Sequence, residues 1–229
     1  MTDKEYTSQK TKLLKDFDKA LGRVEPWLID RYGDQETLVL IDGSRQEYQT
    51  IIPQIPDIGN RMLLMLFLLP ATRYLAVYRT MLSHGRSVEE VGQVVYEMGE
   101  TSIKAIPGVF RWLIGTLWFS SFFKNRLRKR AAESQQKRNL DGYVFHFIEG
   151  DGDTFDYGID YSECASTKFL RSQDALPLAP YVCAVDKVAS ELLGWGLRRE
   201  TTVAEGCPRC DFRFKKGGAT NVPVPQSLL

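Results

Sequence analysis

Residues 143–164 read YVFHFIEGDGDTFDYGIDYSEC, and they limit the class of fold that the chain can adopt. Two runs dense in aromatic and β-branched residues, 143–148 and 155–161, flank a connection rich in Gly and Asp. Apolar and polar side chains alternate in the second run, as in a strand that buries one face. The pattern predicts a β-hairpin.

The segments after this hairpin complete a small sheet. Four further elements are predicted: helices over 164–170 and 177–193, and paired strands over 197–203 and 212–214. Gly194 and Gly196 are expected to end the longer helix. The small and polar residues that follow Gly217 predict a mobile tail over 217–229.

The residues before the hairpin are predicted to be helical. Three stretches show helical spacing of their apolar residues: 10–32, 63–83 and 88–98. Ser87 and Glu90 form a capping-box pattern at the start of the third stretch, whereas 37–41 fits a short strand as well as the edge of a helix. The fold class is therefore α/β of the α+β kind, a single domain over 1–229. Its helical half, 1–138, packs on a small antiparallel sheet within 139–216.

The charge and the apolar content of the chain limit the classes of function that it can have. Lys and Arg number 30 against 29 Asp and Glu, a formal charge of +1 that does not favour nucleic acid as a partner. We expect a small-molecule substrate, no nucleotide cofactor, and an assembly that could be a homo-oligomer. The polar N-terminus lacks the apolar core of a signal peptide and predicts a cytoplasmic protein. The apolar run 62–69 is far shorter than the roughly 20 residues of a transmembrane helix.

An aromatic run, 106–123, is followed by the basic run KNRLRKR at 124–130. An aromatic helix with a basic tail could lie on a membrane surface or against a partner. It could also be a core helix whose exposed end carries solvated charges, and this is the interpretation we expect. A third interpretation places four aromatic side chains in the wall of an apolar pocket: Phe110, Trp112, Trp118 and Phe119.

The cysteines are concentrated near the C-terminus, and none precedes residue 164. In the cytosol they are expected to be free thiols or metal ligands. The candidate zinc ligands are Cys164, Cys183, Cys207 and Cys210. Four thiolates would make a closed structural site, whereas three, without Cys207, would leave a position for an activated water. The plain alternative is that each cysteine is a small core residue.

Three motifs in this region carry a resemblance: FDYGIDYSEC at 155–164, the C-x-x-D pair of Cys183 and Asp186, and RETTVAEGCPRCDFRFK at 199–215. They resemble the L-2-amino-thiazoline-4-carboxylic acid hydrolase family, and YRTMLSHGRSVEEV at 78–91 adds a weaker similarity. The order of elements is also similar to 4-vinyl reductase-type ligand-binding domains, which is an analogy of fold alone.

The resemblance implies a hydrolase that opens a small cyclic amidine or thiazoline carboxylic acid. Water adds to the carbon between nitrogen and sulfur, and the thiolate leaves. The implied catalytic residues are Cys183, Asp186 and Cys210, and the implied substrate-binding residues are Arg199 and Thr202. Two nearby charged residues, Asp211 and Arg213, are further candidates for substrate binding. Since residues three apart on a helix share a face, Asp186 could act as a general base beside Cys183. Either Cys183 or Cys210 could instead be a thiolate nucleophile.

Two other functions remain open from the sequence. The protein could be a non-catalytic module that binds a small ligand or a protein, with its cysteines holding structural zinc. It could also be a biosynthetic enzyme that performs different ring chemistry on the same scaffold. Each polar candidate also has an ordinary alternative: Asp186 as a solvated helix residue, Asp211 as a cap of the turn, and Arg199 and Arg213 as outward-facing cations.

Overall fold

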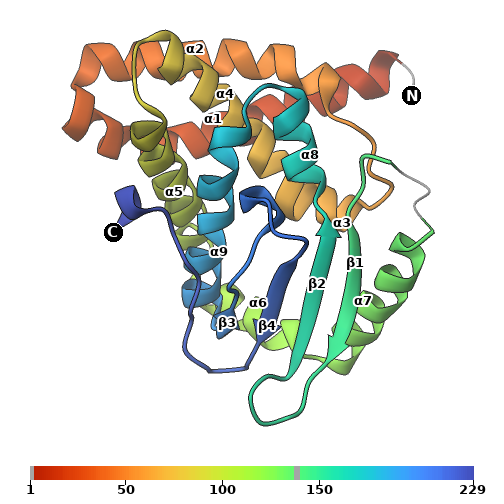
Figure 1. Ribbon diagram of the computed structural model, residues 1–229. Helices are drawn as coiled ribbons and strands as arrows, with labels where there is room; N and C mark the ends of the chain where they lie inside the picture. Colours follow the sequence, from red (N-terminus) through yellow and green to blue (C-terminus); the bar gives the residue numbers. More distant parts are fainter. Residues whose placement is uncertain (1–2, 137–139) are drawn as a thin grey trace.

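The computed structural model describes residues 3–136 and 140–229, with side chains from residue 9 onward. Its helices are α1 (Asp3–Tyr32), α2 (Asp34–Ile51), α3 (Arg61–Leu63), α4 (Leu69–Ser83), α5 (Val88–Lys104), α6 (Gly108–Trp118), α7 (Ser121–Ser134), α8 (Ala165–Ser172) and α9 (Ala179–Leu193). Its strands are β1 (Val144–Glu149), β2 (Tyr157–Glu163), β3 (Leu197–Arg198) and β4 (Cys210–Phe214). The α+β class is confirmed (Figure 1). The boundary expected between 138 and 139 lies outside the described residues.

The N-terminal half is helical, as its apolar spacing predicts. Segment 37–41 belongs to helix α2, whose buried positions recur every three or four residues: Thr37, Leu40, Ser44, Tyr48 and Ile51. A π-helical turn, η2 (Leu64–Leu68), joins α3 to α4. Ser87 and Glu90 form the predicted capping box at the start of α5.

Helix α5 packs closely on α9 and so joins the two halves. Gly92 and Gly99 lie on the face of α5 that meets α9, where an added Cβ would clash with Tyr181 and with Val185 respectively. The missing side chains let the two helices approach each other. Helix α9 therefore sits between α5 and the sheet (Figure 1).

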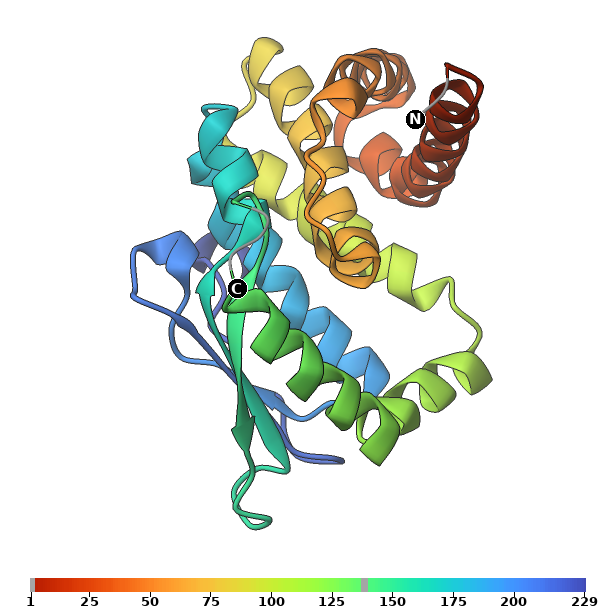
Figure 2. The same ribbon diagram turned by 90° about the vertical axis from the view of Figure 1, so that its right-hand side faces the viewer.

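The sheet is antiparallel with the order β1-β2-β4-β3. The predicted hairpin is confirmed as β1 and β2, and the second predicted pair as β3 and β4. Strand β3 has only two residues, and the 3-10 helix η4 (Val203–Glu205) begins after four further residues. Helices α7 and α9 lie along one face of the sheet (Figure 2). Tyr161 and Cys210 are paired on this covered face.

The segment after Gly217 lies against the fold. Asn221 exchanges backbone hydrogen bonds with Leu197 and Arg199, and Val222 is buried. Ser227, in the 3-10 helix η5 (Gln226–Leu228), accepts a hydrogen bond from Gln93 through its carbonyl and shares another with the Tyr181 hydroxyl. The segment therefore packs against the fold through these contacts, and its expected mobility stays a prediction.

The aromatic run forms two helices rather than one. The side chain of Ser120 caps α7, so α6 ends at Trp118. The expectation that the run packs in the core is wrong for most of α6, since Phe110 and Trp112 are exposed and only Gly115 and Trp118 are buried. Gly115 lies against the end of α9, so the opposite side of α6 faces the solvent.

One described stretch, residues 61–83, is long and apolar enough to cross a membrane. More than half of its apolar window is buried inside the protein, as in the core helix of a globular fold.

Candidate active site

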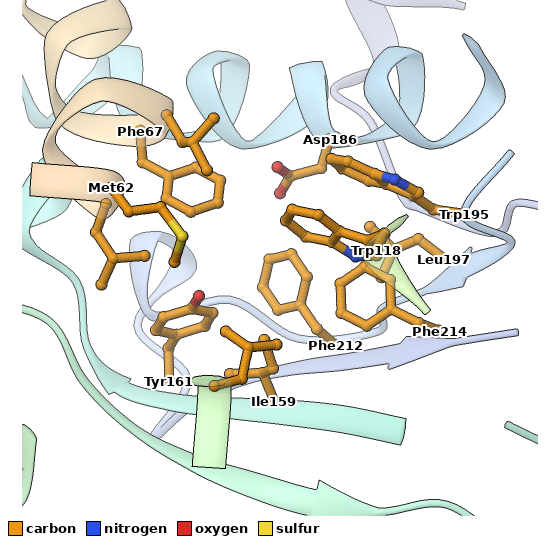
Figure 3. A pocket seen from close by; sticks show the side chains of 13 residues that line it. Met62, Phe67, Trp118, Ile159, Tyr161, Asp186, Trp195, Leu197, Phe212 and Phe214 are labelled. Atoms are coloured by element: carbon orange, nitrogen blue, oxygen red, sulfur yellow. The ribbon is translucent and has the colours of Figure 1, made fainter. Parts of the chain in front are cut away.

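A cavity opens between the helical half and the covered face of the sheet (Figure 3). Its room for the centre of a water-sized molecule is about 20 Å³, so the cavity is small, and it is partly open to solvent. Aromatic and aliphatic side chains form its walls, among them Phe67 from η2, Trp118 from α6, and Phe212 and Phe214 from β4. Asp186 is the only charged residue described in this lining.

Asp186 lies on the face of α9 that is turned toward the sheet. In Figure 3 its carboxylate points into the cavity beside the rings of Trp118 and Trp195, which stack with centroids 4.3 Å apart. The side chain keeps 21% of its surface exposed although the residues around it are apolar. A ligand in the cavity would therefore meet a carboxylate set among flat aromatic surfaces.

Arg199 holds this carboxylate from behind. It directly follows β3, its side chain is only 3% exposed, and its Nη1 donates to Asp186 Oδ2 and, at 3.0 Å, to the carbonyl of Cys183. The guanidinium also lies over the ring of Phe212, 5.6 Å from its centroid. Its Nε is buried and has no hydrogen-bond partner among the described residues.

Burial raises the pKa of Asp186 to about 6, although the charge of Arg199 and its hydrogen bond both act to lower it. A carboxyl group with this pKa ionises just below neutral pH, where it can take a proton from water. The cavity and the ion pair therefore make Asp186 a candidate general base, and the catalytic role itself stays a prediction.

The cysteines near Asp186 have raised pKa values and therefore form thiolates poorly. Burial raises the pKa of Cys183 well above its ordinary value despite the charge of Arg199. Burial also raises the pKa of Cys210 to about 12, although the amide of Val203 donates to its Sγ at 3.2 Å. For Cys164, burial likewise raises the pKa. Near neutral pH these groups are thiols, which favours Asp186 over a cysteine as the reactive group.

No group of three or more His, Cys, Asp and Glu side chains is placed to hold a metal ion in the described parts of the chain. Cys207 lies in the turn before β4, where its amide donates to the carbonyl of Thr202. Zinc binding by three or four of the cysteines stays a prediction.

The remaining predicted binding residues have partners outside the cavity. Thr202 caps η4 through hydrogen bonds with Glu205. Burial acts to raise the pKa of Asp211, but hydrogen bonds from Thr201 and Glu200 outweigh it, so the pKa is lowered. Arg213 binds Asp160 at 2.7 Å on the opposite face of the sheet, since it alternates with Phe212 and Phe214.

Tyr161 is a site residue that the sequence analysis missed. It lines the cavity from β2, and in Figure 3 its hydroxyl points into the open space. Burial raises its pKa, so the hydroxyl stays protonated and can donate a hydrogen bond. Its alternation with Ile159 in the hairpin placed it on the buried face, but only the pairing with β4 brings it opposite Cys210.

Fold and cavity together define an α+β protein with a buried carboxylate and guanidinium pair at an aromatic pocket. The chain belongs to the L-2-amino-thiazoline-4-carboxylic acid hydrolase family, whose model matches residues 67–214, more than half of the sequence. The first and last matched residues, Phe67 and Phe214, both line the cavity. Comparison with curated proteins and with solved structures gave no match.

Proposed function

We propose that this protein hydrolyses a small cyclic amidine acid of the thiazoline type in the cavity beside Asp186. The observation that carries the proposal is the carboxylate of Asp186, which faces a cavity of aromatic walls with a pKa of about 6. Membership of a family described as a hydrolase of this substrate class supports it.

In the proposed reaction Asp186 is the general base. Its carboxylate takes a proton from a water molecule, and the oxygen of that water bonds to the ring carbon between nitrogen and sulfur. The C=N double bond of this carbon becomes a single bond, and its nitrogen takes the proton from Asp186. The bond from this carbon to sulfur then breaks as the added hydroxyl becomes a carbonyl, and the departing thiolate takes the hydroxyl proton, which leaves an N-carbamoyl thiol. No cysteine of the protein changes its bonding in these steps.

Arg199 is proposed as a positioning residue. It fixes one oxygen of Asp186 and leaves the other directed at the cavity, and its charge keeps the carboxyl pKa below the value that burial alone would give. Since Arg199 already neutralises Asp186, the substrate carboxylate is expected to point toward the open side of the cavity. This proposal replaces the substrate-binding role that the resemblance implied for Arg199.

Tyr161 is proposed as a hydrogen-bond donor to the substrate. Its protonated hydroxyl faces the same space as Asp186, whose charge adds to the effect of burial in raising the pKa of Tyr161. A donor in a dry site can stabilise charge that develops on the ring during attack, and removing such a donor typically lowers the rate by about 10²–10³-fold.

The test is hydrolysis of 2-amino-thiazoline-4-carboxylic acid, followed by mass spectrometry of the N-carbamoyl-cysteine product. We expect Asp186→Asn to lower turnover by about 10²–10⁴-fold while the protein stays folded. Glu191→Gln, on the exposed side of the same helix, is the matched control and should leave turnover unchanged. Full turnover by Asp186→Asn would exclude this residue as the base.

The apolar lining favours one other function, binding of a flat apolar ligand without chemistry. The variant Asp186→Asn distinguishes the two functions. A binding module would show no turnover in the wild type and would keep its ligand affinity in Asp186→Asn, as calorimetry with the unreacted thiazoline acid would show. An enzyme would bind the acid and convert it only when Asp186 is present.

A further inference from the structure

Helix α6 presents an apolar face to solvent. Six large apolar side chains, each 42–76% exposed, cover α6 and the start of α7: Val109, Phe110, Trp112, Leu113, Leu117 and Phe122. This outward orientation is fixed, because Gly115 on the opposite side of α6 contacts the backbone of Leu193 and leaves no room for a Cβ. We call these six residues the α6 patch. No described residue covers it.

Most charges around the patch are cationic, although three of the cations are ion-paired: Lys104 with Glu100, Arg128 with Glu149 and Arg130 with Glu133. Residues 101–132 contain seven Lys and Arg and no Asp or Glu, although the whole chain carries only +1. Phe122, Arg126 and Lys129 are all exposed and share one face of α7, since they follow the i, i+4, i+7 spacing. Arg126 and Lys129 form no ion pair with any described residue. The patch therefore has a cationic margin.

We propose that the α6 patch docks on an anionic lipid surface. Exposed Trp and Phe next to Lys and Arg are the side chains that suit the boundary between acyl chains and negatively charged headgroups. A second copy of this chain is a poorer occupant, because the unpaired cations Arg126 and Lys129 would face their own copies. An anionic bilayer matches both the apolar face and its margin.

Docking would bring the cavity to the lipid surface. Trp118, on the inner side of α6, lines the cavity, and so does Leu66, which is nearly half exposed at the turn η2. Helix α6 is thus at once the wall of the cavity and the proposed membrane contact. The proposal depends on α6 and α7 alone, so it stands or falls separately from the proposed hydrolysis.

The experiment is co-sedimentation of the full chain with vesicles. We expect binding to phosphatidylcholine vesicles that contain about a third phosphatidylglycerol, little binding to pure phosphatidylcholine, and weaker binding as salt increases. Trp112→Ser and Phe122→Ser should each lower the affinity by about tenfold or more. The double change Arg126→Gln with Lys129→Gln should lower it by about 30-fold.

Matched controls lie on the helical half. Leu38→Ser removes an exposed apolar side chain from α2, and Lys15→Gln with Lys19→Gln removes two exposed cations from α1; neither should change vesicle binding. Circular dichroism establishes that every variant is folded. Absence of binding to the anionic vesicles at low salt overturns the proposal, and so does equal loss in patch and control variants. A dimer in light scattering that Trp112→Ser dissociates would assign the patch to a second copy instead.

Discussion

At the scale of single residues, the environment of Asp186 has a consequence for stability. Its pKa in the folded protein, about 6, lies above the ordinary value of 3.8 because burial penalises the charged form. The folded state therefore binds the proton more tightly than the unfolded state does. The resulting stabilisation is full below about pH 4 and is lost as the pH rises through about 6.

We therefore predict that wild type loses stability relative to Asp186→Asn between about pH 4 and pH 6. The difference in free energy of unfolding should change by about 2–3 kcal/mol over this range, since one pKa unit corresponds to about 1.4 kcal/mol. Urea unfolding of both proteins at a series of pH values measures it. A difference that is constant with pH would show that the carboxyl group is not perturbed. Glu191→Gln should follow the wild type throughout.

The thiols give a second prediction at this scale. Since burial raises the pKa of Cys183 and Cys210, both should react with iodoacetamide at neutral pH at least a hundredfold more slowly than in unfolded protein, on the order expected from the thiolate fraction. Site-resolved mass spectrometry of alkylated peptides gives each rate. Rapid labelling of either cysteine in the native state would instead support the hypothesis that this cysteine is a thiolate nucleophile. Elemental analysis of the same sample tests for zinc.

At the scale of secondary-structure elements, the contact of α5 with α9 is set by glycine. We predict that Gly92→Ala destabilises the protein by about 1–3 kcal/mol, because the new methyl group would overlap the ring of Tyr181. Gly22→Ala, in α1 with open space around it, should instead stabilise the protein by about 0.5–1 kcal/mol. Thermal unfolding of both variants checks the pair. Destabilisation by both changes would show that helix packing is not the cause.

Local signals account for the elements that the sequence predicted. The capping box at Ser87 and the alternation in β2 depend on neighbours within a few residues, so they are visible in the sequence. The outward face of α6 is not visible there, because an apolar helix is ordinarily buried and only its contact with the end of α9 turns that face to solvent. Segment 37–41 was ambiguous because its five residues are too few to show the helical period that continues to Ile51.

The candidate site was predictable only in part. Cys183 and Asp186 share a face because they lie on one helix, which spacing alone shows. The partnership of Asp186 with Arg199 depends on where β3 runs relative to α9, and the position of Tyr161 depends on the register between β2 and β4. Such long-range relations arise from the packing of the sheet on the helices and have no local signature.

At the scale of the whole molecule, the C-terminal segment stabilises the site from outside. Asn221 pairs through its backbone with Leu197 and Arg199, so the position of the guanidinium depends on residues more than twenty positions away. Its neighbour Val222 is buried against the core. The ion pair of Arg199 with Asp186 therefore depends on the packing of the C-terminal segment against the core.

Removal of residues 221–229 should lower the free energy of unfolding by about 2–4 kcal/mol, since it exposes apolar surface and breaks backbone hydrogen bonds. Asn221→Ala is the control: the bonds at this position come from the backbone, and the change should cost less than about 1 kcal/mol. Urea unfolding of the three proteins compares them. Equal stability of the shortened and full chains would mean that the segment is only loosely associated.

Because α5 and α9 lie so close together, substitutions at two positions far apart in the chain constrain each other during evolution. The space at Gly92 is filled by the ring of Tyr181, so volume can be gained at one of these positions only where it is given up at the other. The residues are 89 positions apart in the chain, yet they cannot drift independently. In related chains, a larger residue at the first position should coincide with a smaller one at the second, and the pair should change as a unit.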